Sequence, residues 1–367
     1  MIRSALISAL LASALAVGPV HAAGKTLVME PIDMEGGGGT LFVTPEGKSL
    51  LIDTGSPAND RQPVGLDGAK GGVDRIVAMA HALGVKKIDY LLITHYHADH
   101  LGGIFELIKR MPIGTFIDHG ANREVPNPNE PPNSMTNRMA PDTIKNYAEY
   151  IKEIKGHKHI VAKPGEVFHF GSLTDTIVSA DSKFIAKPLP GAGEPGQHCD
   201  EPPNPLDGGI ENTKSVGSIL SFGKVKIAVL GDLTWNMEHE LFCPIDKVGH
   251  VNILLVTHHG LHWSSHPASI AAFRPDIVVM GNGAKKGAEP EVVNRINASP
   301  GLQAFWKMHS SLDYGSLDGD PNYIANTQAP PDMGYTIRLN IARDGKVAVT
   351  NTRNGFSKAY SVQLSRA

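Results

Sequence analysis

Cysteine is scarce in this chain: Cys199 and Cys243 are the only two among 367 residues. Two cysteines exclude a disulfide-rich scaffold, because one bridge is the most that they can form. They could pair in an oxidising compartment, but the sequence cannot show whether their Cα atoms lie within bridging distance. A disulfide, two free thiols, and a metal ligand at Cys199 beside His198 therefore stay open as alternatives.

An excess of positive charge is also lacking. The chain has 34 lysine and arginine residues against 37 aspartate and glutamate residues, which gives a net charge of −3 at pH 7. Proteins that bind nucleic acid usually carry a basic patch or run, and residues 283–287, with two lysines, are too short for one. We therefore expect a small-molecule substrate and regard nucleic acid as a disfavoured partner that is not excluded. The oligomeric state stays open.

Beyond the first 22 residues, no apolar run is long enough to span a bilayer. The N-terminal segment has Arg3 near its start, an apolar run over residues 5–17, and small residues before Ala22. This pattern is typical of a signal peptide. We expect residues 1–22 to be removed, residues 23–367 to form one hydrolase domain, and the protein to be periplasmic or secreted. A membrane anchor is the alternative interpretation.

One series of elements occurs twice in the sequence. Each copy begins with a β-hairpin pattern that ends in an acid, Asp53 or Asp232, and continues through a helix. Each copy then ends in an apolar strand followed by Thr-His, at "YLLITH" (His95) and "ILLVTH" (His258). Since apolar strands resemble one another, the shared order is the stronger signal. It predicts an α/β protein of two related halves, packed face to face, whose strand ends open on one shared site.

Hydrophobic periodicity places the other elements. Apolar residues at helical spacing predict helices over residues 73–84, 142–156 (capped by Asp142), 235–242, 267–273 and 289–298. A hairpin over residues 335–351 turns at Asp344-Gly345. Residues 120–141 and 183–209 are rich in proline, asparagine or glycine and predict long irregular segments. Such long loops in a compact domain usually serve a function, so we expect them to set substrate specificity.

Three histidines and an aspartate crowd into six positions at the end of the first repeated strand: His95, His97, Asp99 and His100. Side chains of an extended strand alternate, so positions 95, 97 and 99 point the same way. A tight turn before Gly102 can bring His100 beside them. Imidazoles and carboxylates in this arrangement suit zinc or another borderline divalent ion. The alternative, a histidine-rich surface loop, does not explain this spacing directly after a buried strand.

The motif His95-x-His97-x-Asp99-His100, followed by Leu-Gly-Gly, resembles the signature of the metallo-β-lactamase superfamily. "LLIDTG" and "AVLGD" are similar to two further motifs of that family, and "VTHHG" most resembles the branch with the hydrolase domain of competence DNA-uptake proteins. The resemblance implies a four-layer αββα sandwich with a metal site at the sheet edges.

The resemblance also implies a set of metal ligands. By analogy, His95 and His97 hold one metal, Asp99 and His100 hold a second, and Asp232 bridges the two. His258 completes the second site, because it matches His95 in the internal repeat. The neighbouring His259 then donates a proton or orients a ligand from behind. For Asp53 two roles stay open: orienting a ligand histidine, or closing a turn on its own backbone.

One expected ligand is missing. Many family members place a third histidine before the strand that leads to the bridging acid, but Lys214 of "NTKSVGS" stands at that position. The first metal therefore has fewer protein ligands, binds weakly, or is absent. His119 or His198 could substitute, although a lone histidine at either place has a structural explanation as well.

These residues predict a metal-dependent hydrolase. Zinc lowers the pKa of the water it binds to about 7, and Asp99 could orient the resulting hydroxide or take its proton. We expect one or two zinc ions, with manganese as an alternative, and attack on a small ester, amide or phosphodiester. The alternatives are an exported phosphodiesterase or nuclease, and a non-catalytic metal-binding module.

Overall fold

The computed structural model describes residues 26–57, 71–205, 208–327 and 334–363. The predicted signal peptide, residues 1–22, lies outside these residues. One sheet of nine strands runs in the order β18-β17-β16-β1-β2-β3-β4-β5-β6. Its strands are β1 Thr26–Pro31, β2 Thr40–Val43, β3 Ser49–Ile52, β4 Ile88–Leu92, β5 Ile113–Asp118, β6 Lys158–Val161, β16 Ile337–Ala342, β17 Lys346–Asn351 and β18 Ser357–Ser361.

A second sheet runs in the order β15-β14-β13-β12-β11-β10-β8-β7, and β9 also pairs with β8. Its strands are β7 Val167–Phe170, β8 Leu173–Ala180, β9 Lys183–Phe184, β10 Gly217–Phe222, β11 Val225–Val229, β12 Ile253–Leu255, β13 Ile277–Met280, β14 Ala304–His309 and β15 Ile324–Asn326.

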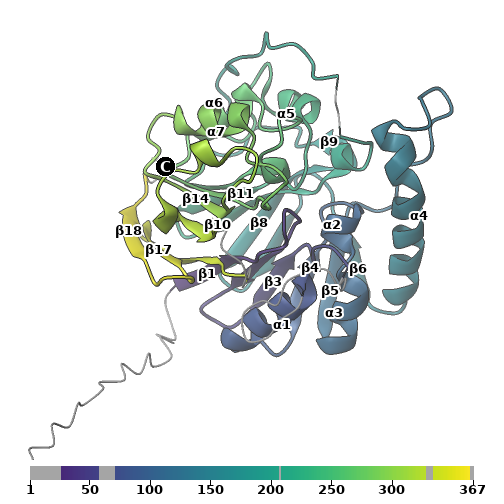
Figure 1. The fold of residues 1–367 in the computed structure, drawn as a ribbon, viewed down its shortest axis with the longest axis horizontal. Coiled ribbons are helices and arrows are strands. Elements are labelled where there is room, and N and C mark those ends of the chain that lie inside the picture. Colours follow the sequence, from purple (N-terminus) through teal and green to yellow (C-terminus); the bar gives the residue numbers. More distant parts are fainter. Residues whose placement is uncertain (1–25, 58–70, 206–207, 328–333, 364–367) are drawn as a thin grey trace, which may run out of the picture.

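Helices cover the outer face of each sheet, as Figure 1 shows. The first sheet is covered by α1 Gly72–Ala82, α2 Ala98–Leu101, α3 Ile104–Arg110 and α4 Met135–Glu153, and the second by α5 Trp235–Phe242, α6 Pro267–Phe273 and α7 Pro290–Asn297. The layers are therefore helix, sheet, sheet, helix, which confirms the predicted αββα sandwich. No helix of the described ranges is both long and apolar enough to cross a membrane.

Alternation along the strands produces this layering. On β3, Leu50 and Ile52 pack into the core between the two sheets, whereas Leu51 packs into the core beneath α1 and α3. Successive strand side chains point to opposite faces, so a strand buried on both faces needs the continuous apolar run that the sequence has there. Phe242 of α5 and Phe273 of α6 belong to a third core on the far side of the second sheet.

The two repeated series occupy equivalent places. Strand β3 pairs in parallel with β4, and β11 pairs in parallel with β12. Strands β4 and β12 are followed within a few residues by His95 and His258. Although β4 and β12 lie in different sheets, Nε2 of His100 is only 3.2 Å from Nε2 of His259, so both histidine segments open on the same side of the sandwich. The predicted order of elements is present in both halves.

Helix α4 begins earlier than the sequence predicts. We expected Asp142 to cap it, but it starts at Met135, and the Ser134 hydroxyl accepts a hydrogen bond from the Asn137 amide at 3.2 Å. The Asn137 side chain also donates to the carbonyl of Asn127 at 2.9 Å. Proline usually marks the first turn of a helix, yet Pro141 lies inside this one. The cap at Ser134 and the anchored loop before it start the helix ahead of the proline.

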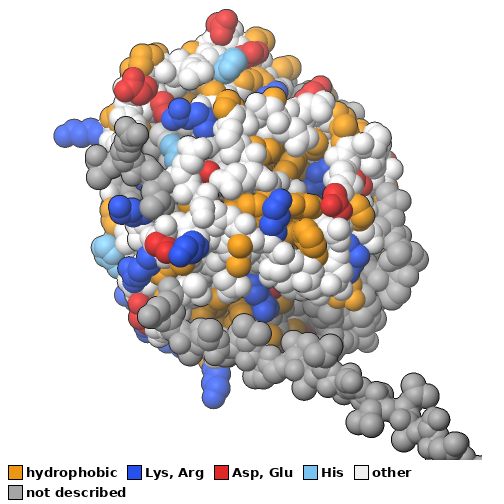
Figure 2. Space-filling model, turned by 90° about the vertical axis from the view of Figure 1, so that its left-hand side faces the viewer, with side chains coloured by type: hydrophobic (Ala, Val, Ile, Leu, Met, Phe, Trp, Pro, Cys, Tyr) orange, Lys and Arg blue, Asp and Glu red, His pale blue; other side chains and the backbone are white. Residues whose placement is uncertain are grey.

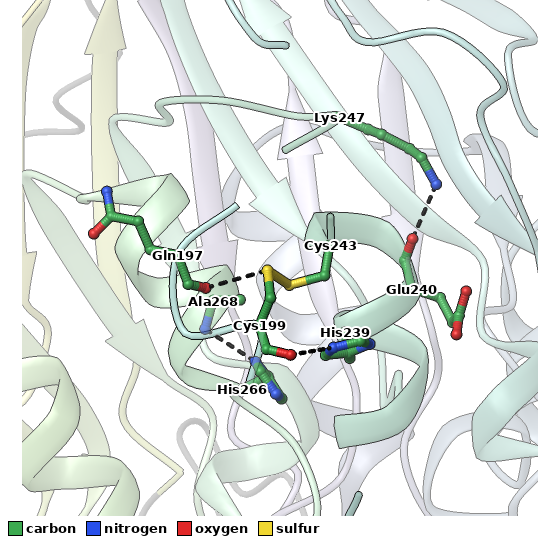
Figure 3. Close-up of a disulfide and its surroundings, with 8 residues drawn as sticks. All are labelled: Gln197, Cys199, His239, Glu240, Cys243, Lys247, His266 and Ala268. Atoms are coloured by element: carbon green, nitrogen blue, oxygen red, sulfur yellow. Dashed lines mark hydrogen bonds between the residues drawn. A yellow bond between two sulfur atoms is a disulfide. The ribbon is translucent and has the colours of Figure 1, made fainter. Parts of the chain in front are cut away.

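Cys199 and Cys243 form a disulfide across 44 positions, shown in Figure 3. Of the three alternatives left open by the sequence, the structure therefore has the disulfide, and not two free thiols or a metal ligand at Cys199. The bond joins the irregular segment 183–209 to the end of α5, and the His239 ring donates to the Cys199 carbonyl at 3.1 Å. The Asn204 amide in turn donates to the Asn236 side chain at 3.0 Å. The segment that approaches the predicted site is therefore held at several points.

Candidate metal centre

The candidate centre lies where strands of both sheets end. His95 and His97 follow β4, and the short helix α2 carries Asp99 and His100. Asp232 follows β11, and the turn Thr257–Gly260 follows β12. The side chains involved are buried except for Asp99, whose side chain is 26% exposed. The predicted ligands therefore come together from segments more than a hundred positions apart.

His95 and His97 form a first group. The Nε2 atom of His95 lies 3.1 Å from Nδ1 of His97, and both rings are buried. Burial, followed by the nearby imidazoles of His100 and His97, holds the pKa of His95 well below its usual value. A neutral imidazole has one nitrogen free to accept. Two ring nitrogens this close either share one proton or face one cation.

Asp99, His100, Asp232 and His259 form a second group, whose ligand atoms all lie within 4.8 Å of one another. Nε2 of His100 is 3.2 Å from Asp232 Oδ1 and 3.2 Å from Nε2 of His259. Asp99 Oδ2 lies 3.6 Å from Nε2 of both histidines. Two carboxylates and two imidazoles that converge in this way are a donor set that divalent ions favour.

Asp232 connects the two groups. Its Oδ1 faces the second group, and its Oδ2 lies 3.3 Å from Nε2 of His258 and 3.9 Å from Nε2 of His95. Burial alone raises the pKa of a carboxyl, but the imidazoles of His100, His258 and His259 outweigh it and hold the pKa of Asp232 well below its usual value. Asp232 Oδ1 is buried and lacks a hydrogen-bond partner among the described residues. A buried, ionised carboxylate of this kind fits a bound cation.

The two adjacent histidines are placed differently from the sequence prediction. We expected His258 to complete the second group and His259 to stand behind it. In the structure His259 Nε2 lies in the second group, 3.4 Å from Asp232 Oδ1, and His258 Nε2 lies beside the other oxygen, Oδ2. Both residues have positive φ, at 53° and 57°. The comparison of His258 with His95 assumed that both follow their strands in the same way. It fails because the chain leaves the extended conformation at His258.

Hydrogen bonds from outside the two groups orient the rings. Asp53 Oδ2 lies 2.7 Å from Nδ1 of His100, and Asp53 Oδ1 accepts from the Thr94 amide at 2.7 Å. Asp53 therefore contacts a histidine of the second group and does not serve only its own turn. Nδ1 of His259 donates to the Gly281 carbonyl at 3.2 Å, which leaves Nε2 facing the group. Partners of this kind fix the tautomer and direction of metal-binding histidines.

Glu124 and Lys286 are two contacts that the sequence did not single out. Glu124 is fully buried and lies 2.9 Å from Nε2 of His97, while it also accepts from Thr143 and from the Ile210 amide. The ammonium group of Lys286 forms an ion pair with Asp99. Glu124 lies in the irregular segment 120–141, which we expected to be functional. Lys286 lies in the short stretch 283–287, which the sequence analysis considered only as a possible basic run.

The other predicted candidates lie elsewhere. His119 Nε2 is bound to Glu211 Oε2 at 2.9 Å, and the Lys214 ammonium donates to the Ser182 hydroxyl at 2.8 Å. His198 precedes the disulfide in the chain and belongs to neither group. Two neighbours of Lys214 approach the site: Nδ2 of Asn212 lies 3.5 Å from Nε2 of His258, and the Ser215 hydroxyl accepts from the Asp232 amide at 3.2 Å.

The glycine run at residues 36–39 packs directly against the second group. The Gly38 amide donates to the Asp99 carbonyl at 2.9 Å. A Cβ atom on Gly38 would lie 2.5 Å from His100 Nδ1 and 2.6 Å from Asp53 Oδ2, closer than real Cβ atoms approach other atoms. Glycine is therefore required here because the backbone itself forms the wall behind these residues.

Several solved structures share similarity with this chain. YhfI of Bacillus subtilis, a metallo-beta-lactamase fold protein, is 12% identical over 76% of this chain and 95% of that chain, with a TM-score of 0.41. A Veillonella parvula protein described as a possible metal-dependent hydrolase is 13% identical over 86% and 99%, with a TM-score of 0.40. CmlA, a diiron β-hydroxylase of Streptomyces venezuelae, is 14% identical over 77% and 52%, with a TM-score of 0.40. No curated protein matches the chain.

The family model described as the metallo-beta-lactamase superfamily matches residues 35–281. This interval is more than half of the chain and contains both groups of the candidate centre. It does not distinguish branches of the superfamily, so the resemblance to competence proteins stays a prediction. The matched interval, together with the αββα layers, shows that the chain belongs to the metallo-β-lactamase superfamily.

Proposed function

We propose that this protein is an exported hydrolase that holds two divalent ions, zinc or manganese, and cleaves a small ester, amide or phosphodiester. The arrangement of Asp232 carries the proposal, because its two oxygens face two separate sets of imidazoles. The first ion would be held by His95 and His97, and the second by Asp99, His100 and His259, with Asp232 between them.

The donor atoms fit this assignment. Five imidazoles and two carboxylates surround the centre within the described residues, and neutral imidazole and carboxylate are common ligands of zinc. Ions bound there would supply Lewis acidity and a water-derived nucleophile at neutral pH. The protein's part is to hold the donors in place and to orient the substrate.

Asp99 is the member of the centre that faces solvent. Burial raises the pKa of a carboxyl, but the Lys286 ammonium and His100 outweigh it and hold the pKa of Asp99 well below its usual value. Its Oδ2 lies 3.6 Å from Nε2 of His100 and of His259 and also pairs with Lys286. We therefore assign Asp99 to ligation and orientation.

Export and a small substrate rest on further observations. The predicted signal peptide and the Cys199–Cys243 disulfide support an oxidising compartment. Figure 2 shows one face of the molecule, where the described acidic and basic side chains are interspersed. The net charge of −3 is consistent with a small substrate more than with a long polyanion.

Metal analysis tests this proposal directly. Protein purified without chelators should contain zinc or manganese, and a panel of chromogenic esters, amides and phosphodiesters should include one that is cleaved. Asp99→Asn should reduce that cleavage by roughly 100-fold or more, since a metal ligand is changed. Protein that neither contains nor takes up zinc or manganese would contradict the proposal.

A further inference from the structure

The first group, His95 and His97, offers too few donor atoms to complete the coordination of an ion. His95 and His97 supply two nitrogens, and Asp232 supplies one oxygen that it shares with other residues. The position where the sequence analysis looked for a third histidine holds Lys214, which donates to Ser182 instead. The geometry points to His258 as the missing ligand, so that the adjacent His258 and His259 bind different ions. This inference rests on the two-ion function proposed above.

The position of the His258 ring supports this assignment. Its Nε2 lies 3.3 Å from Asp232 Oδ2, the oxygen that also faces His95 at 3.9 Å. His259 instead faces Asp232 Oδ1, the oxygen beside His100. The carboxylate thus separates the histidine pair, with one imidazole on each of its oxygens. His258 is 4% exposed, so nearly all of its ring is enclosed by the protein.

The other ring nitrogen of His258, Nδ1, already has a hydrogen-bond partner. Nδ1 lies 3.0 Å from the hydroxyl of Ser264, a fully buried residue. If Nδ1 carries the proton and donates to that hydroxyl, Nε2 has its lone pair directed at the centre. This is the usual arrangement of a metal-binding histidine, whose second ring nitrogen is held by a polar group. Asn212 Nδ2, 3.5 Å away, is at the limit of hydrogen bonding and leaves that lone pair available.

The backbone explains how two adjacent side chains enter one site. Neighbouring residues of a strand point to opposite faces, but His258 and His259 have φ values of 53° and 57°, and Gly260 follows at 84°. Non-glycine residues seldom adopt this left-handed conformation, and where they do it often marks a functional site. The His258 amide donates to the Gly231 carbonyl at 3.0 Å, which fixes the turn against the residue before Asp232.

Alternative donors near the first group are already committed. His119 Nε2 is bound to Glu211 at 2.9 Å. Glu124 is held on the far nitrogen of His97, so it orients that ring and does not face the same point as His95. Of these neighbours, His258 is the one with a nitrogen directed at the oxygen that Asp232 presents to the first group.

Metal stoichiometry of matched variants tests this inference. We would prepare the full chain with His258→Gln, His259→Gln or, as a control, His262→Gln, whose ring contacts Glu289. Each protein would be stripped with a chelator and titrated with Co²⁺, with bound metal measured by elemental analysis and its visible absorption recorded. We expect two equivalents in the unchanged protein and the control, and one in each of the other variants. The two remaining single sites should differ in their spectra, because their donor sets differ.

The outcomes separate this inference from the proposed function. An unchanged protein that binds no metal contradicts the proposed function itself. Two equivalents with unchanged spectrum in His258→Gln overturn only the inference, as does an identical remaining spectrum in His258→Gln and His259→Gln. A single equivalent in the unchanged protein contradicts the two-ion assignment and overturns the inference with it.

A separate control checks that each variant folds. The metal-free variants should have the same circular dichroism spectrum as the unchanged protein. If His258→Gln fails to fold, Ser264→Ala replaces it, because this change removes only the partner of Nδ1. We then expect the affinity of one equivalent to fall by about 10-fold or more while the other is unchanged. Equal affinities of both equivalents in Ser264→Ala and the unchanged protein would overturn the inference.

Discussion

Nε2 of His100 lies 3.2 Å from Nε2 of His259, although 159 positions separate these residues. His100 follows a strand of the first sheet and His259 follows a strand of the second. The two halves of the protein are therefore in direct contact at this site. Both rings are buried, so these two nitrogens are partners of one another. Either one Nε2 donates a hydrogen bond to the other, or both direct a lone pair at a shared cation.

Asp53 should control metal affinity without touching the metal. Its carboxylate lies 2.7 Å from Nδ1 of His100 and also holds the Thr94 amide. We expect Asp53→Ala to weaken binding of the second ion by about 10- to 100-fold, as is typical when the partner of a metal-binding histidine is removed. Competition with a chromophoric chelator measures this. The surface variant Asp74→Asn should leave the affinity unchanged, and an equal effect of both changes would contradict the assigned role.

Gly38 should tolerate no side chain. A Cβ atom there would lie 2.5 Å from His100 Nδ1 and 2.6 Å from Asp53 Oδ2. We expect Gly38→Ala to lower the free energy of unfolding by about 1–3 kcal/mol through overpacking and to weaken metal binding. Gly281→Ala is the matched control, since a Cβ atom at Gly281 meets nothing within 4 Å. Chemical denaturation with and without metal measures both effects, and similar results for the two variants would refute the steric argument.

Asp175 should make the protein less stable as pH rises. Burial raises the pKa of Asp175 to about 7, and its main partner is the Ser218 hydroxyl at 2.9 Å. Below about pH 4 the folded and unfolded states are both protonated. Between about pH 4 and pH 7 only the unfolded state loses its proton, so stability falls over this window and the loss is complete above it.

Asp175→Asn should therefore stabilise the protein at pH 8 relative to the unchanged chain, by about 1–4 kcal/mol, and much less at pH 4. Urea denaturation at the two pH values, with chelator present throughout, provides the measurement. The exposed Asp142→Asn controls for loss of one negative charge. A gain from Asp175→Asn that is the same at both pH values would show that folding does not raise the pKa of Asp175.

The Cys199–Cys243 disulfide should contribute to stability through the length of the loop it closes. A separation of 44 positions corresponds to about 4 kcal/mol of loop entropy in the unfolded chain. We expect the double variant Cys199→Ala and Cys243→Ala to lose roughly this amount in chemical denaturation. Reductant should destabilise the unchanged protein and have no effect on the double variant. Insensitivity of the unchanged protein to reductant would indicate that the bond is not formed.

Hydrolysis should depend weakly on salt. A small substrate makes few ionic contacts, whereas a protein that neutralises 6–10 phosphates loses about 10³- to 10⁵-fold in affinity between 50 and 200 mM salt. We expect kcat/KM for a small chromogenic substrate to change less than about tenfold over that range, and linear DNA to remain uncut. Metal-dependent DNA cleavage that disappears at high salt would favour the nuclease alternative.

The sequence by itself determined the local parts of this protein. The alternating apolar runs, the repeated hairpin–helix–strand order and the spacing of His95, His97, Asp99 and His100 act over a few residues. Side-chain periodicity translates such spacing directly into direction. The two-sheet sandwich and the crowding of four donors at one strand end could therefore be predicted without coordinates.

The tertiary structure decided the contacts between distant segments. Placing His259 and not His258 in the second group depended on two left-handed residues, which the internal repeat gave no sign of. The partners Glu124 and Lys286, and the pairing of Cys199 with Cys243, join segments whose proximity follows only from packing. Sequence fixes which side a nearby residue faces, whereas the meeting of remote side chains depends on how the two halves dock.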